Sequence, residues 1–463
     1  MLRSETKKLI LLAGDIVLLY AGLALTLYLR YDMSWFPASP TKNAWELHKM
    51  PFLLVHTLWV FIFYSAGMYD WERFTPRRIS LVKLVFKSMA AGTAIAVLFF
   101  YFIPAFNITP KTNLIIDALV VAVFLSLWRI VFLKAISKSS KIKIVFFGST
   151  VESNAFKRHL DVSPSLGYKV EAVIEHSDAS INLKHLILER GIDLVVTVSD
   201  ISGDQKMLKL FYEAIPLGVT ITDFPKFYES IMGKVPVSVI NESWFLENLF
   251  ELDKRTFEGA KRVVDIVASL TLSIPMLVLF IPITAAIVLS TPRDIWHYKE
   301  RRARTGDGII FFKQPRVGKN GKVFYFIKFR SQVLGAEQMG EIKELKEDRR
   351  QYTVGKFLRK TYLDELPQIL NILRGEMSLV GPRPERPEYV ENLKKQIPFY
   401  EIRLLVKPGI TGWAQINMKN DASVEDAPEK LQYDLYYIKN RSLLGDLAIM
   451  AKTATILASR SGR

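Results

Sequence analysis

The stretch GKFLRKTYLDELPQILNILRGEMSLVGPRPERP, residues 355–387, contains the most informative pattern in the chain. It places the adjacent carboxylates of Asp364 and Glu365 upstream of Arg383, which lies between two prolines. Carboxylates can hold a divalent metal or attack phosphorus, and a guanidinium binds phosphate oxygens through paired hydrogen bonds. The alternative is a helix with two acidic residues in its first turn, followed by a surface loop. The pattern predicts phosphate chemistry, provided that the rest of the sequence agrees.

The composition divides the chain between apolar and charged segments. Hydrophobic residues make up 50% of the 463 residues and charged residues 23%, with a net charge of +16. This length allows two or three domains, and the positive charge favours phospholipid, nucleotide or nucleic acid as partners. The chain has no cysteine, which excludes disulfides, thiolate zinc sites and cysteine catalysis. The first apolar run has the length of a full span and no small-residue cleavage site, so we expect an anchor.

Apolar segments in the first third of the chain predict a membrane α-helical bundle of four spans, within residues 1–141. They cover residues 9–30, 51–68, 84–104 and 113–133. Lys and Arg are concentrated before the first segment, between the second and third, and after the fourth. Because these residues favour the cytoplasmic side, both ends of the bundle are predicted to be cytoplasmic. Asp15 and Asp117 lie inside apolar runs, where a carboxylate either packs between helices or has a function.

A further apolar run, residues 263–289, differs from these spans. It contains Pro275 and Pro282, and both of its flanks are strongly basic. An ordinary span would place one basic flank outside, against the charge rule. Because proline removes a backbone hydrogen bond and kinks a helix, we favour a re-entrant helix–break–helix over a span, hinged near Ser273 and Pro275.

Residues 142–235 predict a Rossmann-like α/β domain, which a linker over 236–256 follows. Its strands are expected at 142–147, 169–175, 193–199 and 219–223, with helices near 151–161, 182–190 and 204–216. Alternating strands and helices indicate a doubly wound parallel sheet. Only Gly148 follows the first strand, where a dinucleotide-binding unit has three glycines. We therefore expect a structural or regulatory module rather than a cofactor site.

The region before the carboxylate pair adds basic residues. A glycine-flanked turn at 318–321 predicts a hairpin. Lys328 and Arg330 alternate with Phe329, so on a strand they share one face, which either binds an anion or is simply solvated. Arg359 precedes the acidic pair, and the apolar spacing after it predicts an amphipathic helix. Asp364 and Glu365 are thus expected at a helix N-terminus, where backbone N–H groups favour negative charge and phosphate.

From about residue 257 to the C-terminus, the chain resembles the monotopic polyprenol-phosphate phosphoglycosyl transferases, the bacterial sugar transferases. The motifs that carry this resemblance are Gln314-x-Arg316-Val317-Gly318, Lys328-Phe329-Arg330-Ser331, Arg359, Asp364-Glu365-Leu366-Pro367-Gln368, Met377-Ser378-Leu379-Val380-Gly381-Pro382-Arg383-Pro384-Glu385 and Lys407-Pro408-Gly409-Ile410-Thr411-Gly412-Trp413. The segments before them are similar in layout to the large polyisoprenyl-phosphate hexose-1-phosphate transferases. Gln332 and the long connection 294–307 depart from the family pattern, and neither touches the acidic pair.

The resemblance implies a C-terminal α+β catalytic domain, residues 257–463, with a re-entrant helix at 263–289. It implies transfer of a hexose 1-phosphate from a nucleoside-diphosphate sugar, with a UDP-sugar preferred, to undecaprenyl phosphate. Asp364 would be the nucleophile that forms a covalent phospho-sugar aspartate, and Glu365 would position metal or acceptor. Mg²⁺ is the implied cofactor, with Asp364 and Glu365 as its ligands. The implied phosphate and substrate binders are Lys328, Arg330, Arg359, Arg383, Pro384 and Glu385.

The same resemblance implies a place in the cell and a set of partners. The protein is expected in the bacterial inner membrane as a multi-pass homodimer, with the catalytic domain on the cytoplasmic face. It would perform the first membrane step of exopolysaccharide, capsule or O-antigen synthesis. A catalytically silent scaffold of polysaccharide assembly is the alternative, although the acidic pair is intact. Nucleic acid is not an expected partner, because the basic residues cluster at membrane flanks rather than in a basic–aromatic stripe.

Overall fold

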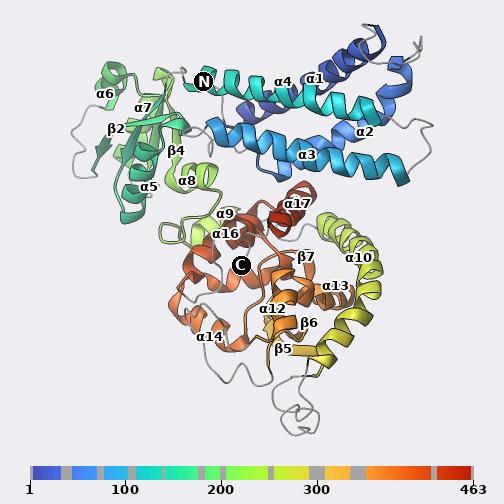
Figure 1. The fold of residues 1–463 in the computed structure, drawn as a ribbon. Coiled ribbons are helices and arrows are strands. Elements are labelled where there is room, and N and C mark those ends of the chain that lie inside the picture. Colours follow the sequence, from blue (N-terminus) through green and yellow to red (C-terminus); the bar gives the residue numbers. More distant parts are fainter. Residues whose placement is uncertain are drawn as a thin grey trace. The chain divides into compact units, whose positions relative to one another are not determined.

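The computed structural model describes residues 4–32, 44–69, 78–102, 111–137, 141–175, 183–198, 205–248, 255–290, 308–333, 351–418 and 425–459. The chain divides into two compact units, Met1–Phe227 and Tyr228–Arg463. Figure 1 follows the helices and strands of each unit along the sequence.

The first unit begins with helices at all four positions predicted for spans. They are α1 (Ser4–Leu27, continued by a π-helical turn Tyr28–Asp32), α2 (Ala44–Ser65), α3 (Arg78–Phe102) and α4 (Lys111–Ser137). They pack around a shared apolar core that includes Trp59 and Phe63. Among the described helices, those long and apolar enough to cross a membrane cover Lys8–Tyr31, Ala44–Tyr64, Thr112–Phe132 and Thr256–Leu289. By this measure α3 is not one of them, and the fourth segment that qualifies belongs to α10 (Arg255–Leu289) rather than to the bundle.

Both carboxylates predicted inside apolar runs are buried and paired. Asp15 Oδ2 accepts a hydrogen bond from Arg129 Nη2 at 2.5 Å, which joins α1 to α4. Asp117 Oδ2 lies 3.1 Å from His56 Nε2, which joins α4 to α2. Buried charges are costly unless they are paired, so these contacts agree with the helix-packing interpretation of the two residues.

The α/β part of the first unit contains a four-stranded parallel sheet. Its strands are β1 (Ile142–Phe147), β2 (Tyr168–Ile174), β3 (Leu194–Thr197) and β4 (Thr220–Asp223), in the order β2-β1-β3-β4. The helices are α5 (Val151–Val162), α6 (Leu183–Arg190) and α7 (Gln205–Ala214), and α8 (Phe224–Met232) begins in this unit and ends in the second. All pairings are parallel, and the four strands and the helices α5, α6 and α7 lie close to their predicted positions, whereas α8 was not predicted.

The switch point between β1 and β3 is where such a sheet would bind a ligand. Here Gly148 has a φ of 87°, and α5 begins directly after it. Thr150 Oγ1 accepts from the Ser153 N–H at 3.1 Å, while Ser153 Oγ accepts from the Thr150 N–H at 2.8 Å. This reciprocal cap satisfies backbone donors that a phosphate would otherwise use. A structural or regulatory role for this domain stays a prediction.

The second unit contains α9 (Glu242–Asn248), α10 (Arg255–Leu289), a β-hairpin and a mostly helical C-terminal part. The hairpin pairs β5 (Phe311–Val317) with β6 (Val323–Phe329) in antiparallel register. Asn320 and Gly321 have φ of 56° and 75°, so the predicted turn is confirmed. The later elements are α12 (Thr353–Lys360), η10 (Leu363–Gln368), α13 (Ile369–Arg374), β7 (Ser378–Val380), α14 (Pro387–Gln396), β8 (Gly409–Thr411), α15 (Trp413–Asn417), α16 (Ala427–Lys439) and α17 (Leu443–Ser459).

The short parallel pair β7 and β8 is held by backbone contacts that only glycine permits. A Cβ at Gly381 would lie 2.4 Å from the Lys407 carbonyl oxygen, and one at Gly409 would lie 2.1 Å from the Gly381 nitrogen. The Gly381 N–H donates to Thr411 O at 2.9 Å, and the Gly409 N–H donates to Pro382 O at 3.0 Å. The chain that leads into Arg383 is therefore fixed along its backbone.

α10 is one continuous helix that includes Pro275 and Pro282, so the predicted break into two helices is not found. The helix is curved instead (Figure 1), as expected where proline removes a backbone bond without ending the helix. Side chains in its middle are exposed, including Ile274, Leu277 and Ile281. Residues nearer its two ends pack on the same second unit. Entry and return on one membrane face stays a prediction.

Part of the predicted linker 236–256 belongs to the core of the second unit. Ile240 and Trp244 are buried there, and so is Val235, the last residue predicted for the Rossmann-like domain. Gly233 also contributes, because its carbonyl accepts from Trp413 Nε1 at 2.7 Å. The division of the chain at Phe227 agrees with this packing.

We predict that a truncated chain beginning at Asp253 is less stable than one beginning at Tyr228. The shorter chain loses the buried Ile240 and Trp244, and emptying such core positions costs roughly 2–5 kcal/mol each. Thermal unfolding of the two detergent-solubilised chains measures the difference, which we expect to be at least several degrees. Equal midpoints would show that 228–252 does not stabilise the unit.

Candidate active site

The acidic pair lies in the 3₁₀ helix η10, between α12 and α13, rather than at the start of an α-helix. Tyr362 has a φ of 57°, and this left-handed residue turns the chain out of α12 and into η10. Asp364 and Glu365 occupy the first turn of η10. Asp364 is buried, and Ser331 Oγ lies 3.5 Å from its Oδ2. The predicted helical start is therefore a tighter turn, which sets Asp364 against the end of β6.

Glu365 and Arg383 are brought together, although 18 residues separate them. Arg383 Nη2 donates to Glu365 Oε1 at 2.9 Å. The backbone of the loop around Arg383 is also fixed, because Arg403 Nη2 donates to the Arg383 carbonyl oxygen at 2.9 Å. Arg316 Nη1 donates to the Pro384 carbonyl oxygen at 3.1 Å. Arg383 thus points its guanidinium at the acidic pair from a fixed backbone.

Lys328 on β6 lies within the electrostatic reach of the same pair. Burial lowers the pKa of Lys328 to about 8, against the opposing effect of the Asp364 and Glu365 carboxylates. The positive charges of Arg359 and Arg316 lower the same pKa further. The site therefore gathers two carboxylates and several cations predicted from separate motifs.

Arg330, predicted to share a face with Lys328, lies just beyond the end of β6. It follows the last residue of β6 and is buried. Its guanidinium carbon lies 5.7 Å from the centre of the Tyr352 ring, and its carbonyl oxygen accepts from the Tyr352 hydroxyl at 2.5 Å. These contacts support the end of β6, and a phosphate-binding role for Arg330 stays a prediction.

Glu385, predicted as a substrate contact, is surrounded by cations of the protein itself. Lys430 Nζ lies 2.6 Å from its Oε1, Arg316 Nη1 lies 3.8 Å from its Oε2, and Arg403 Nη1 lies 4.0 Å from its Oε1. Burial alone would raise the pKa of Glu385, but Lys430, Arg403 and Arg316 lower it to about 2. Its carboxylate is therefore charged and engaged in supporting the Arg383 loop.

Sequence reasoning missed the residues behind this loop. Arg403 is buried and pairs with Asp434 at 2.8 Å, which positions the guanidinium that holds the Arg383 carbonyl. Lys430 and Asp434 both lie on α16. No local pattern marks these residues, because the contacts that join them to each other and to the Arg383 loop span 20 or more positions of the chain.

The described residues contain no group of three or more His, Cys, Asp or Glu that would hold a metal ion by itself. Mg²⁺ keeps several waters, however, and is often bound by one or two carboxylates together with substrate phosphates. Asp364 and Glu365 are compatible with that donor set, since they are neighbouring carboxylates and Arg383 lies beside Glu365.

Comparison with known proteins identifies the class. The family of bacterial sugar transferases matches residues 256–460. The chain is 38% identical over 236 residues to the UDP-N-acetylgalactosamine-undecaprenyl-phosphate N-acetylgalactosaminephosphotransferase of Aeromonas hydrophila. That alignment covers 51% of this chain and 52% of the relative. It is 31% identical over 360 residues to the undecaprenyl-phosphate galactose phosphotransferase of Salmonella typhimurium, and this alignment covers 70% of the chain and 69% of the relative. A UDP-glucose:undecaprenyl-phosphate glucose-1-phosphate transferase of Xanthomonas campestris is 44% identical over 150 residues, which are 32% of this chain and 31% of the relative.

These matches place the second unit in a family of membrane-associated phosphoglycosyl transferases. The chain belongs to the bacterial sugar transferases. The aligned part spans about half the length of the Aeromonas relative and more than two thirds of the Salmonella relative.

The lowered pKa of Lys328 predicts a pH dependence. If its positive charge assists the reaction, kcat/KM falls as the pH rises through about 8, where Lys328 loses its proton. By pH 9 only about a tenth of the free enzyme would keep this charge. Arg stays protonated, so Lys328→Arg should lose this alkaline limb even if its peak rate is lower. Measuring kcat/KM from pH 6 to 10 for both proteins tests this, and an unchanged limb in the variant would assign the titration to another group.

Proposed function

We propose that this protein transfers a hexose 1-phosphate from a nucleoside-diphosphate sugar to undecaprenyl phosphate, releasing the nucleoside monophosphate. The observation that carries the proposal is the pairing of Glu365 with Arg383 at 2.9 Å, beside the buried Asp364. The names of the Aeromonas and Xanthomonas relatives supply the donor class, a UDP-sugar, and the acceptor. The lipid-linked product would serve exopolysaccharide, capsule or O-antigen assembly.

The reaction would proceed in two displacements at one phosphorus atom. An Asp364 carboxylate oxygen attacks the phosphorus that bears the sugar, and the bond to the bridging diphosphate oxygen breaks. The nucleoside monophosphate leaves with that electron pair. A phosphate oxygen of the acceptor then attacks the same phosphorus, which forms the polyprenyl diphosphate sugar and restores the Asp364 carboxylate.

The cations provide electrostatic stabilisation where negative charge develops on the phosphoryl oxygens. Arg383 is positioned for this by the Arg403 and Arg316 contacts to its loop. Lys328 on β6 and Arg359 on α12 precede the acidic pair in the sequence, whereas Arg383 follows it. Mg²⁺ held by Asp364 and Glu365 would screen the diphosphate charge.

The packing of α10 supports a catalytic domain that sits on one face of the membrane. Asp265, near the start of the helix, accepts from the Leu379 N–H at 3.0 Å. Ile287, near its end, is buried in a cluster with Leu358. Both end regions of α10 thus contact the same compact unit, while its middle exposes apolar side chains. This arrangement suits a helix that enters and leaves the membrane on the same face. The expected face is cytoplasmic, where nucleotide sugars are made.

The proposal is tested by incubating the purified protein with a panel of nucleotide sugars and undecaprenyl phosphate. We expect release of nucleoside monophosphate and a lipid-linked sugar with one donor of the panel, most readily a UDP-sugar. No release with any donor, from folded protein in lipid, would favour the silent scaffold instead.

The orientation of α10 gives a separate prediction. The chain has no cysteine, so single cysteines at positions 254 and 301 are unique labelling sites on either side of the helix. We expect both to be protected from a membrane-impermeant thiol reagent in intact spheroplasts and to be labelled after permeabilisation. Labelling of position 301 alone in intact spheroplasts would make α10 an ordinary span.

A further inference from the structure

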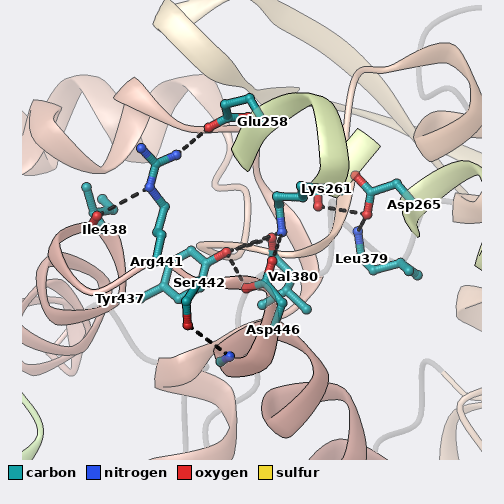
Figure 2. Close-up of polar contacts among 12 residues, drawn as sticks. Glu258, Lys261, Asp265, Leu379, Val380, Tyr437, Ile438, Arg441, Ser442 and Asp446 are labelled. Atoms are coloured by element: carbon teal, nitrogen blue, oxygen red, sulfur yellow. Dashed lines mark hydrogen bonds and ion pairs between the residues drawn. The ribbon is translucent and has the colours of Figure 1, made fainter. Parts of the chain in front are cut away.

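A buried polar cluster joins the first half of α10 to the strand that leads into Arg383. Asp265 Oδ1 accepts from Ser378 Oγ at 3.0 Å. The same oxygen accepts from the Leu379 N–H at 3.0 Å (Figure 2). Asp265 and Ser378 are both buried. These donors belong to β7, and Arg383 follows the end of β7 after Gly381 and Pro382.

The same region of α10 is fixed to α16 and α17. Lys261 Nζ donates to Asp446 Oδ2 and lies 3.3 Å from the Tyr437 hydroxyl. That hydroxyl lies 3.2 Å from the Val380 carbonyl oxygen, at the end of β7 (Figure 2). β7 is therefore held by α10 at its first residues and by the Lys261–Asp446–Tyr437 contacts at its last.

The second half of α10 packs against the other side of the active site. Phe280 stacks with Phe311, and its ring centre is 6.1 Å from that of Phe329. Ile283 and Ile287 belong to the same apolar cluster. Leu363 and Leu366, which flank the acidic pair, pack against this cluster.

One helix therefore contacts both halves of the site: the Arg383 side through hydrogen bonds and the Asp364 side through apolar packing. We propose that Asp265 is a positioning residue, which acts through β7 to hold Arg383 opposite the acidic pair. Through it, the membrane-associated helix α10 sets the spacing between the nucleophile and the phosphate-binding guanidinium. This inference rests on the proposed transferase function.

The physical reason is that a buried donor without a partner is costly. Removing the Asp265 carboxylate leaves the Ser378 hydroxyl and the Leu379 N–H unpaired in the interior. The chain would then relax by moving β7, and small displacements of a positioned group can cost on the order of 10²-fold in rate. Asn at position 265 keeps an oxygen at the same place, so it can still accept both bonds.

The first experiment compares Asp265→Ala, Asp265→Asn and Glu258→Ala in the full-length protein in lipid nanodiscs. Glu258 is the matched control, because it ties α10 to Arg441 without a contact to β7 (Figure 2). Hydrogen exchange of the non-proline amides at 379–385 should accelerate at least tenfold in Asp265→Ala and stay close to wild type in the other two. Equal acceleration in Asp265→Ala and Glu258→Ala, or none in either, would overturn the positioning role.

The second experiment is a double-variant cycle with Arg383→Ala, read as the rate of nucleoside monophosphate release. We expect Asp265→Ala to lower kcat about 10- to 100-fold in the wild-type background and less than about twofold when Arg383 is absent. Asp265→Asn should recover most of the loss. Fully additive losses would mean that Asp265 stabilises the fold without acting through Arg383. If the wild-type protein releases no nucleotide, the transferase proposal fails, and hydrogen exchange alone decides whether Asp265 holds β7.

Discussion

Asp364→Asn is expected to abolish sugar-phosphate transfer, with a loss of at least about 10⁴-fold in kcat. The substitution replaces a buried carboxylate by an amide of nearly the same shape, so the fold should be retained while the nucleophilic oxygen loses its charge. Nucleoside monophosphate release and the lipid-linked product are measured together. Thermal unfolding of the variant checks that the protein is intact.

Glu365→Gln is the matched control for this prediction. Gln keeps an oxygen that can accept from Arg383, so this variant should be severely slowed but remain measurable. Mass spectrometry of the wild-type protein, quenched with donor and without acceptor, should find a phospho-sugar adduct on Asp364. An adduct on any other residue, or an active Asp364→Asn, would reassign the nucleophile.

Arg383→Ala is expected to lower kcat/KM about 10²- to 10³-fold, the range seen when a group that stabilises transition-state charge is removed. The guanidinium contacts Glu365 at 2.9 Å, and Arg403 fixes its loop, so the charge that Ala removes is one held in a defined place. Arg383→Lys keeps the charge but loses the two-pronged geometry, so it should recover only part of the rate.

Arg386→Ala serves as the comparison within the same segment. The guanidinium carbon of Arg386 lies 5.7 Å from the centre of the Tyr389 ring, on the first turn of α14. We expect its removal to change kcat/KM less than about threefold. Similar losses in Arg383→Ala and Arg386→Ala would indicate a general effect of positive charge rather than a specific contact at position 383.

The sequence was sufficient where the signal is local. The turn at Asn320 and Gly321 and the alternation of strands and helices after Ile142 each depend on residues near one another, and both predictions are confirmed. The juxtaposition of Glu365 and Arg383 was suggested because both lie in one short segment.

The remaining features depend on contacts between distant segments. Arg403 and Asp434 support the Arg383 loop from η11 (Tyr400–Leu405) and α16, and nothing in their immediate sequence indicates a shared site. Pro275 predicts a break in α10, whereas the structure has a curved continuous helix whose ends pack on the same unit. Proline removes one hydrogen bond, and tertiary packing on both sides of it decides whether the helix ends.

The close backbone contacts at Gly381 and Gly409 limit how this enzyme can diversify. Neither position has room for even a methyl group, because the atoms nearest to it belong to the opposing main chain. Random substitution there will be eliminated during evolution or in a screening library, whichever sugar is offered. Variants with a new donor preference should therefore arise from side chains around the site, while the backbone that presents Arg383 is inherited unchanged.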